Sequence, residues 1–319
     1  MSFNQFRTNP SQAVSNFKGR SSTPKGWPST AVSEWTNGGL FGGGAEFSGG
    51  TKTEADGYTY VTYTASGTVT CDVGGVVDLI IVGGGGSTST NSGYQQASGG
   101  GGGGGVVAAT GVTIDAGTYG LTIGSGGASP GQNAGGNSSI EMTGLGTNFE
   151  ISSGGGGIGE QGGWGIYNQG GAGQILGTSG SERINVYGGG GGGGTWYNFA
   201  GGAGGSGGGP STNGTPFTAG GTWTTLTSQT GGNGLWNSTS GAGGGSADNT
   251  QTAPSGTGNQ NAGIGYLWVD GERYGGGGYG GGSATSTPVS IYGNGAQSQS
   301  YSVPTYAAQN GVFIVRYPS

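Results

Sequence analysis

Few residues of this chain could carry out catalysis. It has no histidine, so the commonest general base and the commonest metal ligand are both absent. A glycosidase would need two carboxylates about 5–10 Å apart, and the candidate pairs are Glu141 with Glu150 and Asp270 with Glu272. Neither pair lies in a segment with another sign of a cleft, and Asp270 begins an Asp-Gly pair typical of a hairpin turn. We interpret all four as surface or turn acids and predict that the protein is not an enzyme.

Nucleotide, metal and thiol chemistry also lack a matching pattern. A phosphate loop needs a helix after its glycine turn, but the glycines at 83–86 are followed by Ser-Thr-Ser-Thr-Asn, and no Gly-Lys-Ser or Gly-Lys-Thr occurs. A calcium loop needs acids at alternate positions, and none are clustered in this way. Cys71 is the only cysteine, and no histidine is present to lower its pKa. We expect Cys71 to be an inert core residue, and we expect no metal and no cofactor.

Glycine is the dominant residue, with 88 of the 319 positions. Its runs lie at 83–86, 99–105, 154–157, 188–194, 207–209, 243–245 and 275–278. Such runs either form a flexible linker or form polyproline-II-type helices packed side by side, where the missing Cβ lets backbones approach and hydrogen-bond. Collagen is excluded, because the glycines keep no three-residue register and only 10 prolines are present. The large aromatic residues between the runs favour packed helices, since aromatics on a mobile tether would promote aggregation.

The composition limits how much of the chain a conventional core can order. Apolar residues make up 30% and charged residues 7%, and both values are below the globular averages. We therefore expect an apolar core only locally, with backbone hydrogen bonds ordering the rest. The sequence has no run of eighteen apolar residues, the length that could span a membrane, and the N-terminus lacks the apolar segment of a signal peptide.

The basic residues are concentrated near the N-terminus. Residues 1–30 contain Arg7, Lys18, Arg20 and Lys25 and no acid, whereas the whole chain has a net charge of −6. We expect residues 1–40 to form an extended arm that docks on another protein. Its anchoring side chains would be Phe3, Phe6, Arg7, Phe17, Lys18, Arg20, Trp27 and Trp35. The alternative for the two tryptophans is packing on the body of the chain. Nucleic acid is not an expected partner, because so few charges form only a thin patch.

The rest of the chain is predicted to be mainly β, with almost no α-helix. Residues 41–50 are interpreted as a hinge and 51–149 as an antiparallel β-rich unit, with strands at 58–63, 68–73, 76–82, 106–109, 111–114, 119–123 and 137–142. The strand at 76–82 is apolar on both faces, so we expect it to be buried at the centre of a sheet. Residues 150–285 are predicted to form a bundle of polyglycine-II helices with aromatic loops. In 286–319, strands at 300–303 and 311–317 are predicted to return and pair with the β unit.

Several of these segments, taken in order, resemble a known family. They are Asp56-Gly57-Tyr58, Ser66-Gly67-Thr68, Val77-Asp78-Leu79-Ile80-Ile81-Val82 with the first glycine run, Ala116-Gly117-Thr118-Tyr119, Gly135-Gly136-Asn137-Ser138-Ser139 and the closing Ile314-Val315-Arg316-Tyr317-Pro318. The series resembles the glycine-rich domain of structural proteins in tailed bacteriophages, especially marine ones, over about residues 50–319. It is more distantly similar to the distal tail-fibre adhesins of T-even-like phages. Those adhesins pack polyglycine-II helices in a lattice and present aromatic loops to a host receptor.

This resemblance implies a virion protein, with attachment to the host surface as a tail-fibre or spike component as the expected function. The receptor-contact candidates are then the loop aromatics Trp164, Tyr167, Trp196, Tyr197, Phe199, Trp223 and Trp236, which would meet a cell-surface glycan or an outer-membrane protein. Each has an alternative role in capping the lattice or in contacts between subunits. The alternative function is a head fibre or capsid decoration protein without a receptor, held on the shell by the arm. A homotrimer is the oligomer that such fibres suggest, although no coiled-coil heptad enforces it.

Overall fold

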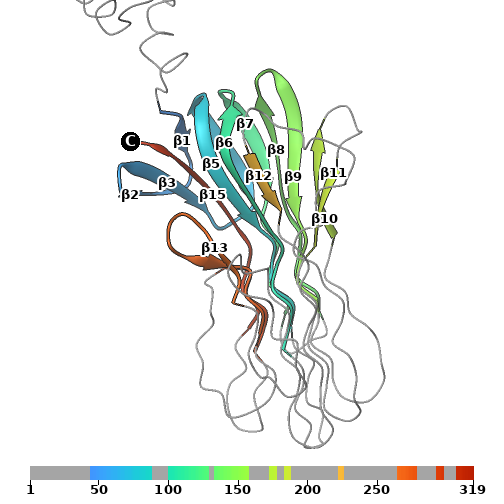
Figure 1. Cartoon of the computed structure of the whole chain (residues 1–319). Coiled ribbons are helices and arrows are strands. Elements are labelled where there is room, and N and C mark those ends of the chain that lie inside the picture. The colour runs from blue at the N-terminus through green and yellow to red at the C-terminus, as the bar shows by residue number, and fades with distance from the viewer. Residues whose placement is uncertain are drawn as a thin grey trace, which may run out of the picture. The chain divides into compact units, whose positions relative to one another are not determined.

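The computed structural model describes residues 44–87, 100–128, 133–157, 172–177, 183–187, 222–225, 264–278, 292–297 and 307–319. These residues form strands joined by turns and extended segments, and no helix occurs among them (Figure 1). None of this described part could therefore cross a membrane as an apolar helix. The prediction of a mainly β protein with antiparallel sheets is confirmed for these residues. Contacts divide the chain after Gly43, and the N-terminal unit, Met1–Gly43, lies outside the described residues.

The first sheet has seven strands, and all of its pairings are antiparallel. In spatial order they are β1 (Glu46–Ser48), β4 (Gly67–Val73), β7 (Gly117–Thr122), β8 (Ser138–Gly144), β9 (Thr147–Ser153), β10 (Ala172–Gly177) and β11 (Arg183–Tyr187). Buried and more exposed side chains alternate along β7 and β8. This alternation is expected of a sheet that packs on a core with one face only.

The second sheet has six antiparallel strands and holds the C-terminal strand at its centre. In spatial order they are β12 (Thr222–Thr225), β6 (Val106–Ile114), β5 (Gly75–Val82), β15 (Val312–Pro318), β3 (Tyr58–Tyr63) and β2 (Thr51–Ala55). Because β15 pairs with β5 on one side and with β3 on the other, the chain does return to its N-terminal β unit, as predicted. A separate short hairpin of β13 (Tyr266–Leu267) and β14 (Arg273–Tyr274) turns through Asp270 and Gly271, also as predicted.

The two sheets enclose the main apolar core between them. Leu79 of β5 and Ile140 of β8 are both buried in this core, one from each sheet, and Cys71 of β4 joins them with 2% of its surface exposed. A second cluster covers the opposite face of the second sheet, where Ile80 packs under Trp268 of the hairpin region. Residues 79–82 of β5 are therefore buried on both faces, as the apolar sequence predicts, whereas Val76 near the start of the strand is 49% exposed.

Two predictions about local structure are wrong. Residues 41–50 are not a hinge throughout, because Glu46–Ser48 form β1, where Phe47 is fully buried with its ring centroid 5.9 Å from that of Tyr317. One large apolar side chain thus holds a glycine-rich segment in the sheet. The strands predicted at 106–109 and 111–114 are one strand, β6, which has an irregular register at Gly111 (φ +66°) near Asp78 of β5.

Candidate functional site

The described glycine runs continue the strands of both sheets. Run 83–87 follows β5, run 100–105 precedes β6, run 123–128 follows β7, run 133–137 precedes β8, run 154–157 follows β9 and run 307–311 precedes β15. We call these six runs, together with 275–278 and 292–297, the glycine bundle. Figure 1 shows the coloured backbone running from the sheets into this bundle. The strands therefore form two separate sheets, whereas the runs that continue them come together in a single bundle.

The central run, 83–87, donates its N–H groups with a period of three residues. Gly83 and Gly86 both donate to run 100–105, at 3.0 and 2.8 Å. Gly84 and Ser87 both donate to run 133–137, at 2.9 and 3.0 Å. Gly85 donates in a third direction, to the carbonyl of Gln309 at 2.9 Å. A strand donates in two directions with a period of two, so this run is not a β-strand of either sheet.

The carbonyls of the same run accept from three further neighbours. Gly84 accepts from run 154–157, Gly85 from run 123–128 and Gly86 from run 292–297, each at 2.8 Å. The central run is thus hydrogen-bonded to six surrounding runs. All of its residues are buried, and in the absence of large side chains its order comes from the backbone hydrogen bonds.

These runs approach so closely that only glycine fits in the centre. A Cβ placed on Gly83, Gly84, Gly85 or Gly86 would lie far inside the contact distance of a backbone carbonyl oxygen, which belongs to Gly154, Ser125, Asn294 and Gly157 respectively. The obstructing atoms are backbone, which cannot rotate away as a side chain can. The absence of side chains in this sequence is therefore a packing requirement, as it is at the axis of collagen.

The ends of the described runs that lie away from the sheets border several segments outside the described residues, one of which contains predicted receptor-contact residues. Segments 88–99, 129–132 and 298–306, which lie outside the described residues, each have a run of the bundle on both sides in the sequence. Ser87, which precedes the first of them, donates to Asn133, which follows the second, at 3.0 Å. Segment 158–171 starts at the same end, after Gly157, and it contains Trp164 and Tyr167. The bundle thus gathers the attachment points of segments that are far apart in the sequence.

The predicted contact residues themselves are mostly outside the described part of the chain. This holds for Trp164, Tyr167, Trp196, Tyr197, Phe199 and Trp236, and for the whole anchoring set Phe3, Phe6, Arg7, Phe17, Lys18, Arg20, Trp27 and Trp35. Trp223 is the exception. It was predicted in a loop, but it lies in β12, opposite Ala109 of β6 at the edge of the second sheet.

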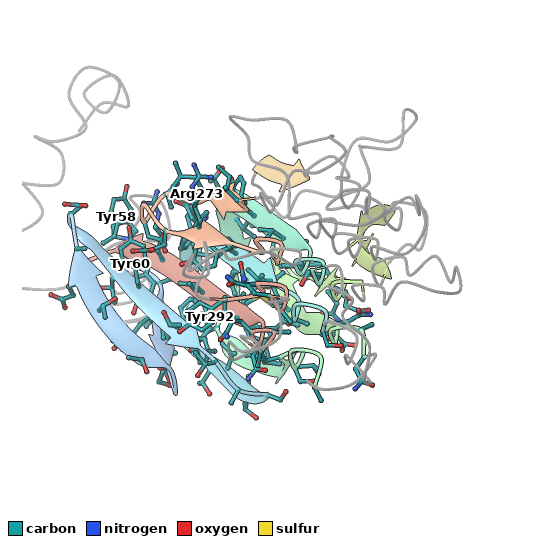
Figure 2. All side chains as sticks on the ribbon, turned by 90° about the horizontal axis from the view of Figure 1, so that it is seen from below. Tyr58, Tyr60, Arg273 and Tyr292 are labelled. Carbon is teal, nitrogen blue, oxygen red and sulfur yellow. The ribbon has the colours of Figure 1, made fainter. Side chains whose placement is uncertain are left out.

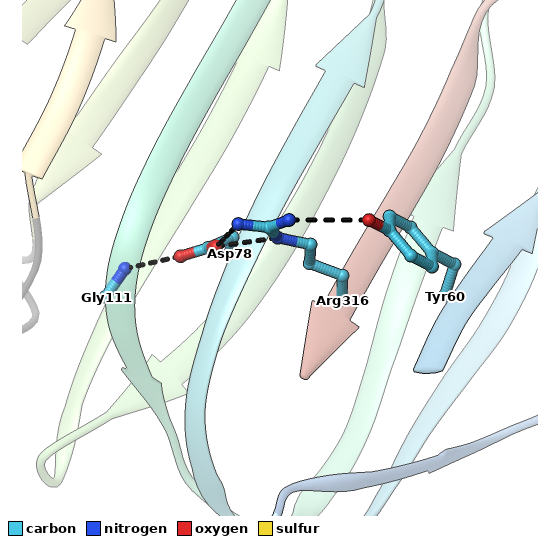
Figure 3. Close-up of polar contacts among 4 residues, drawn as sticks. All are labelled: Tyr60, Asp78, Gly111 and Arg316. Carbon is cyan, nitrogen blue, oxygen red and sulfur yellow. Dashed lines mark hydrogen bonds and ion pairs between the residues drawn. The ribbon is translucent and has the colours of Figure 1, made fainter. Parts of the chain in front are cut away.

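The motif residues Asp78 and Arg316 form one structural unit across the second sheet (Figure 3). They are paired in register on β5 and β15, and the guanidinium donates to the Asp78 carboxylate at 2.8 Å. Asp78 also accepts the backbone N–H of Gly111 at 2.9 Å, where β6 is irregular. The guanidinium lies 4.3 Å from the ring centroid of Tyr58 and donates to the hydroxyl of Tyr60 at 3.4 Å. These contacts give both motifs a structural role in aligning four strands, β6, β5, β15 and β3.

A groove of about 260 Å³ lies between the β13–β14 hairpin and strands β2 and β3. Its buried lining side chains are Tyr60, Tyr274 and Ile314, and Tyr292 adds a half-buried ring that is stacked parallel to Tyr274. Figure 2 shows Tyr58, Tyr60, Arg273 and Tyr292 gathered on this side of the molecule. The groove therefore has an aromatic base formed by residues from separate parts of the sequence.

The polar groups of the groove come from its two sides. Thr53, Thr62 and Asp56 belong to the β2–β3 hairpin, whereas Asp270, Glu272 and Arg273 belong to the β13–β14 hairpin. Asp270 is already engaged, because its carboxylate accepts the hydroxyl of Tyr274 at 2.6 Å and the backbone N–H of Glu272 at 2.9 Å. Burial, and then the hydrogen bond to Asp270, raise the pKa of Tyr274 far above its usual value. Three carboxylates face one guanidinium, so the lining is acidic.

The groove was not predicted from the sequence, although the alternation in residues 58–63 indicates one of its sides. Alternation in 58–63 places Tyr58, Tyr60 and Thr62 on one face of β3. Nothing in residues 266–274 indicates which face that hairpin covers. The acids considered for catalysis are in ordinary places: Glu141 and Glu150 lie opposite each other on β8 and β9, and Asp270 and Glu272 lie in or beside a hairpin turn.

The structure also bears on thiol chemistry and on metal binding. Burial raises the pKa of the Cys71 thiol to about 12, with the nearby charges of Asp72 and Asp115 adding to the effect. Cys71 is thus an unreactive core residue, as predicted. Among the described residues, no group of three or more cysteine, aspartate or glutamate side chains could hold a metal ion.

Comparisons with known proteins assign no family to the chain. No family model matches it, and a search of curated proteins finds no match.

Proposed function

We propose that this chain is a structural protein of a tailed-bacteriophage virion, with a binding rather than a catalytic role. In this proposal it is a tail-fibre or spike component that attaches to the host surface. Residues 1–40 anchor it to other virion proteins, the two-sheet unit is a platform, and the glycine bundle supports the receptor-contact segments. The receptor is a cell-surface glycan or an outer-membrane protein.

The hydrogen bonding of the central glycine run is the observation that carries the proposal. We infer that the runs of the bundle are polyglycine-II helices, which have three residues per turn and no internal hydrogen bonds. The three-residue period of the donors and the six bonded neighbours support this conformation. So do the positions of the carbonyl oxygens, which leave no room for any Cβ on Gly83 to Gly86.

Such a bundle suits the presentation of binding segments. A segment whose ends are held by many backbone hydrogen bonds loses less conformational freedom on binding, so more of its contact energy contributes to affinity. The attachment of 88–99, 129–132, 158–171 and 298–306 at one end supports a common binding surface. Trp164 and Tyr167 belong to this group, and aromatic residues are frequent anchors of interfaces.

The proposal is tested by competition for adsorption. Purified full-length chain is mixed with host bacteria before the phage is added, beside a variant with Trp164→Ser and Tyr167→Ser. We expect the full-length chain to bind cells and to slow adsorption, and the variant to do so less effectively. A chain that lacks residues 1–40 should bind cells equally well but should not bind virions. If no form binds cells, and only the full-length chain binds capsids, in many copies, the protein is a head decoration instead.

A further inference from the structure

The acidic groove between the β13–β14 hairpin and strands β2 and β3 has the composition of a small-ligand site. We propose that it binds a single pyranose sugar that donates hydrogen bonds, with amino sugars preferred over neutral sugars and uronic acids rejected. This site has none of the predicted receptor-contact residues in its described lining. It does not depend on the virion assignment, because it is defined by the groove alone.

The base of the groove provides apolar contact for a sugar ring. Tyr60 and Tyr274 are 7% and 3% exposed, and Ile314 is 4% exposed, so each presents only a small part of its surface at the bottom. Tyr292 is more accessible, and its ring is held by the parallel ring of Tyr274, with centroids 6.4 Å apart. Ligand sites commonly combine an apolar lining with a few polar groups that fix orientation.

The walls leave hydrogen-bonding groups without protein partners. Among the described residues, the carboxylates of Asp56 and Glu272 make no hydrogen bond or ion pair, and the hydroxyls of Thr53 and Thr62 make no hydrogen bond. These groups come from both sides of the groove, so a ring between them could be held at two edges. Carboxylates only accept hydrogen bonds, whereas threonine hydroxyls both donate and accept.

The charge of the lining determines which sugars fit. Asp56, Asp270 and Glu272 are negative, and Arg273, which donates to the carbonyl of Gly265 at 3.0 Å, is the only positive group among the described residues of the lining. A protonated amine on the sugar is attracted by this field and by the faces of the tyrosine rings. A uronic acid brings a further negative charge and is repelled. The expected order is therefore glucosamine, then glucose, then glucuronate.

The test uses the full-length chain and simple sugars at pH 7, measured by saturation-transfer NMR and calorimetry. A shallow site for one ring should give a Kd for glucosamine on the order of 1–10 mM. We expect glucose to bind about tenfold more weakly and glucuronate to show no saturation. Lysine amide is included, because equal binding of this amine and glucosamine would show a cation site and would overturn the sugar assignment.

Two variants connect the binding to the groove. In Asp56→Asn with Glu272→Gln, the affinity for glucosamine should fall about tenfold toward that for glucose; asparagine is well tolerated at the positive φ of residue 56. Thr53→Val should weaken both sugars about threefold or more. Glu54→Gln is the matched control, since residue 54 is exposed on β2 but does not line the groove. No saturable binding of glucosamine, or an equal loss in the control, would overturn the proposal.

Discussion

A single methyl group added to the central glycine run tests the packing of the glycine bundle. The change is Gly85→Ala. Gly85 donates to Gln309 at 2.9 Å and accepts from Gly127 at 2.8 Å, and its added Cβ would overlap the carbonyl oxygen of Asn294. Gly85 is not among the positive-φ residues, so alanine can adopt its backbone conformation. The substitution therefore isolates the steric effect from backbone strain.

The expected loss of folding stability depends on which atoms must move to make room for the methyl group. Overpacking by a methyl group costs about 1–3 kcal/mol, and more where neighbours cannot rearrange. Here the neighbour is the backbone of Asn294, whose carbonyl already accepts from Gln309 at 2.9 Å. Moving it also weakens hydrogen bonds that contribute about 1 kcal/mol each. We expect a total loss of about 3–5 kcal/mol, a large part of the roughly 5–15 kcal/mol that stabilises a typical domain.

The assay is thermal and urea unfolding beside a matched control. Gly120→Ala is the control, because a Cβ at this position on β7 meets nothing within 4 Å. At about 2 °C per kcal/mol for a chain of this size, Gly85→Ala should lower the Tm by about 6–10 °C. Gly120→Ala should be neutral or slightly stabilising, because alanine restricts the unfolded chain. If the two variants differ by less than about 1 kcal/mol, the close packing of the runs is refuted.

Three further predictions concern the two-sheet unit. Arg316→Ala should destabilise the fold by about 2 kcal/mol, because it removes an ion pair with Asp78 whose side chains are only 15% and 18% exposed. A double-mutant cycle with Asp78→Ala, measured by urea unfolding, should give a coupling energy of about 1 kcal/mol. A coupling energy of zero would mean that Arg316 stabilises the fold by packing alone. Leu145→Asn should raise the free energy of unfolding by about 0.5–1 kcal/mol. Residue 145 is 63% exposed and has a φ of +52°, a backbone conformation that asparagine adopts more readily than leucine. An unchanged Tm in thermal unfolding would contradict this prediction. Burial raises the pKa of Cys71 to about 12, so its thiol stays protonated below that pH. Iodoacetamide should therefore alkylate it slowly in the native protein at every pH from about 7 to 10. In guanidinium the alkylation rate should rise through about pH 8.5, and a similar rise in the native protein would refute the burial argument.

The strands of the two-sheet unit were predictable where side chains alternate or form an apolar run. Tyr58–Tyr63 coincides with β3, and the apolar run at 76–82 forms most of β5, which is buried on both faces at 79–82. The strand β1 was not predictable, because Phe47 stands among glycines and its partner, Tyr317, is 270 residues away. Short strands in glycine-rich sequence depend on such distant contacts and leave no local pattern.

The candidate sites show the same limit. The sequence shows that the glycine runs are ordered only if they pack together, but nothing in their sequences indicates which runs are neighbours. The structure supplies the order, with run 83–87, the continuation of β5, hydrogen-bonded to six surrounding runs. The groove was missed for a related reason, since its two sides are separated by more than two hundred residues.

The contrast between the two halves of the fold has a consequence for how the chain can change. In the two-sheet unit, order depends on matched side chains such as Leu79 and Ile140, so substitutions there alter packing volume and cost stability. In the glycine bundle, most of the order comes from N–H and carbonyl groups that every non-proline residue carries, and the central positions Gly83 to Gly86 require that no Cβ be present. We therefore expect that substitutions in the segments between the runs leave these backbone hydrogen bonds in place, and this independence suits a surface that must recognise variable partners.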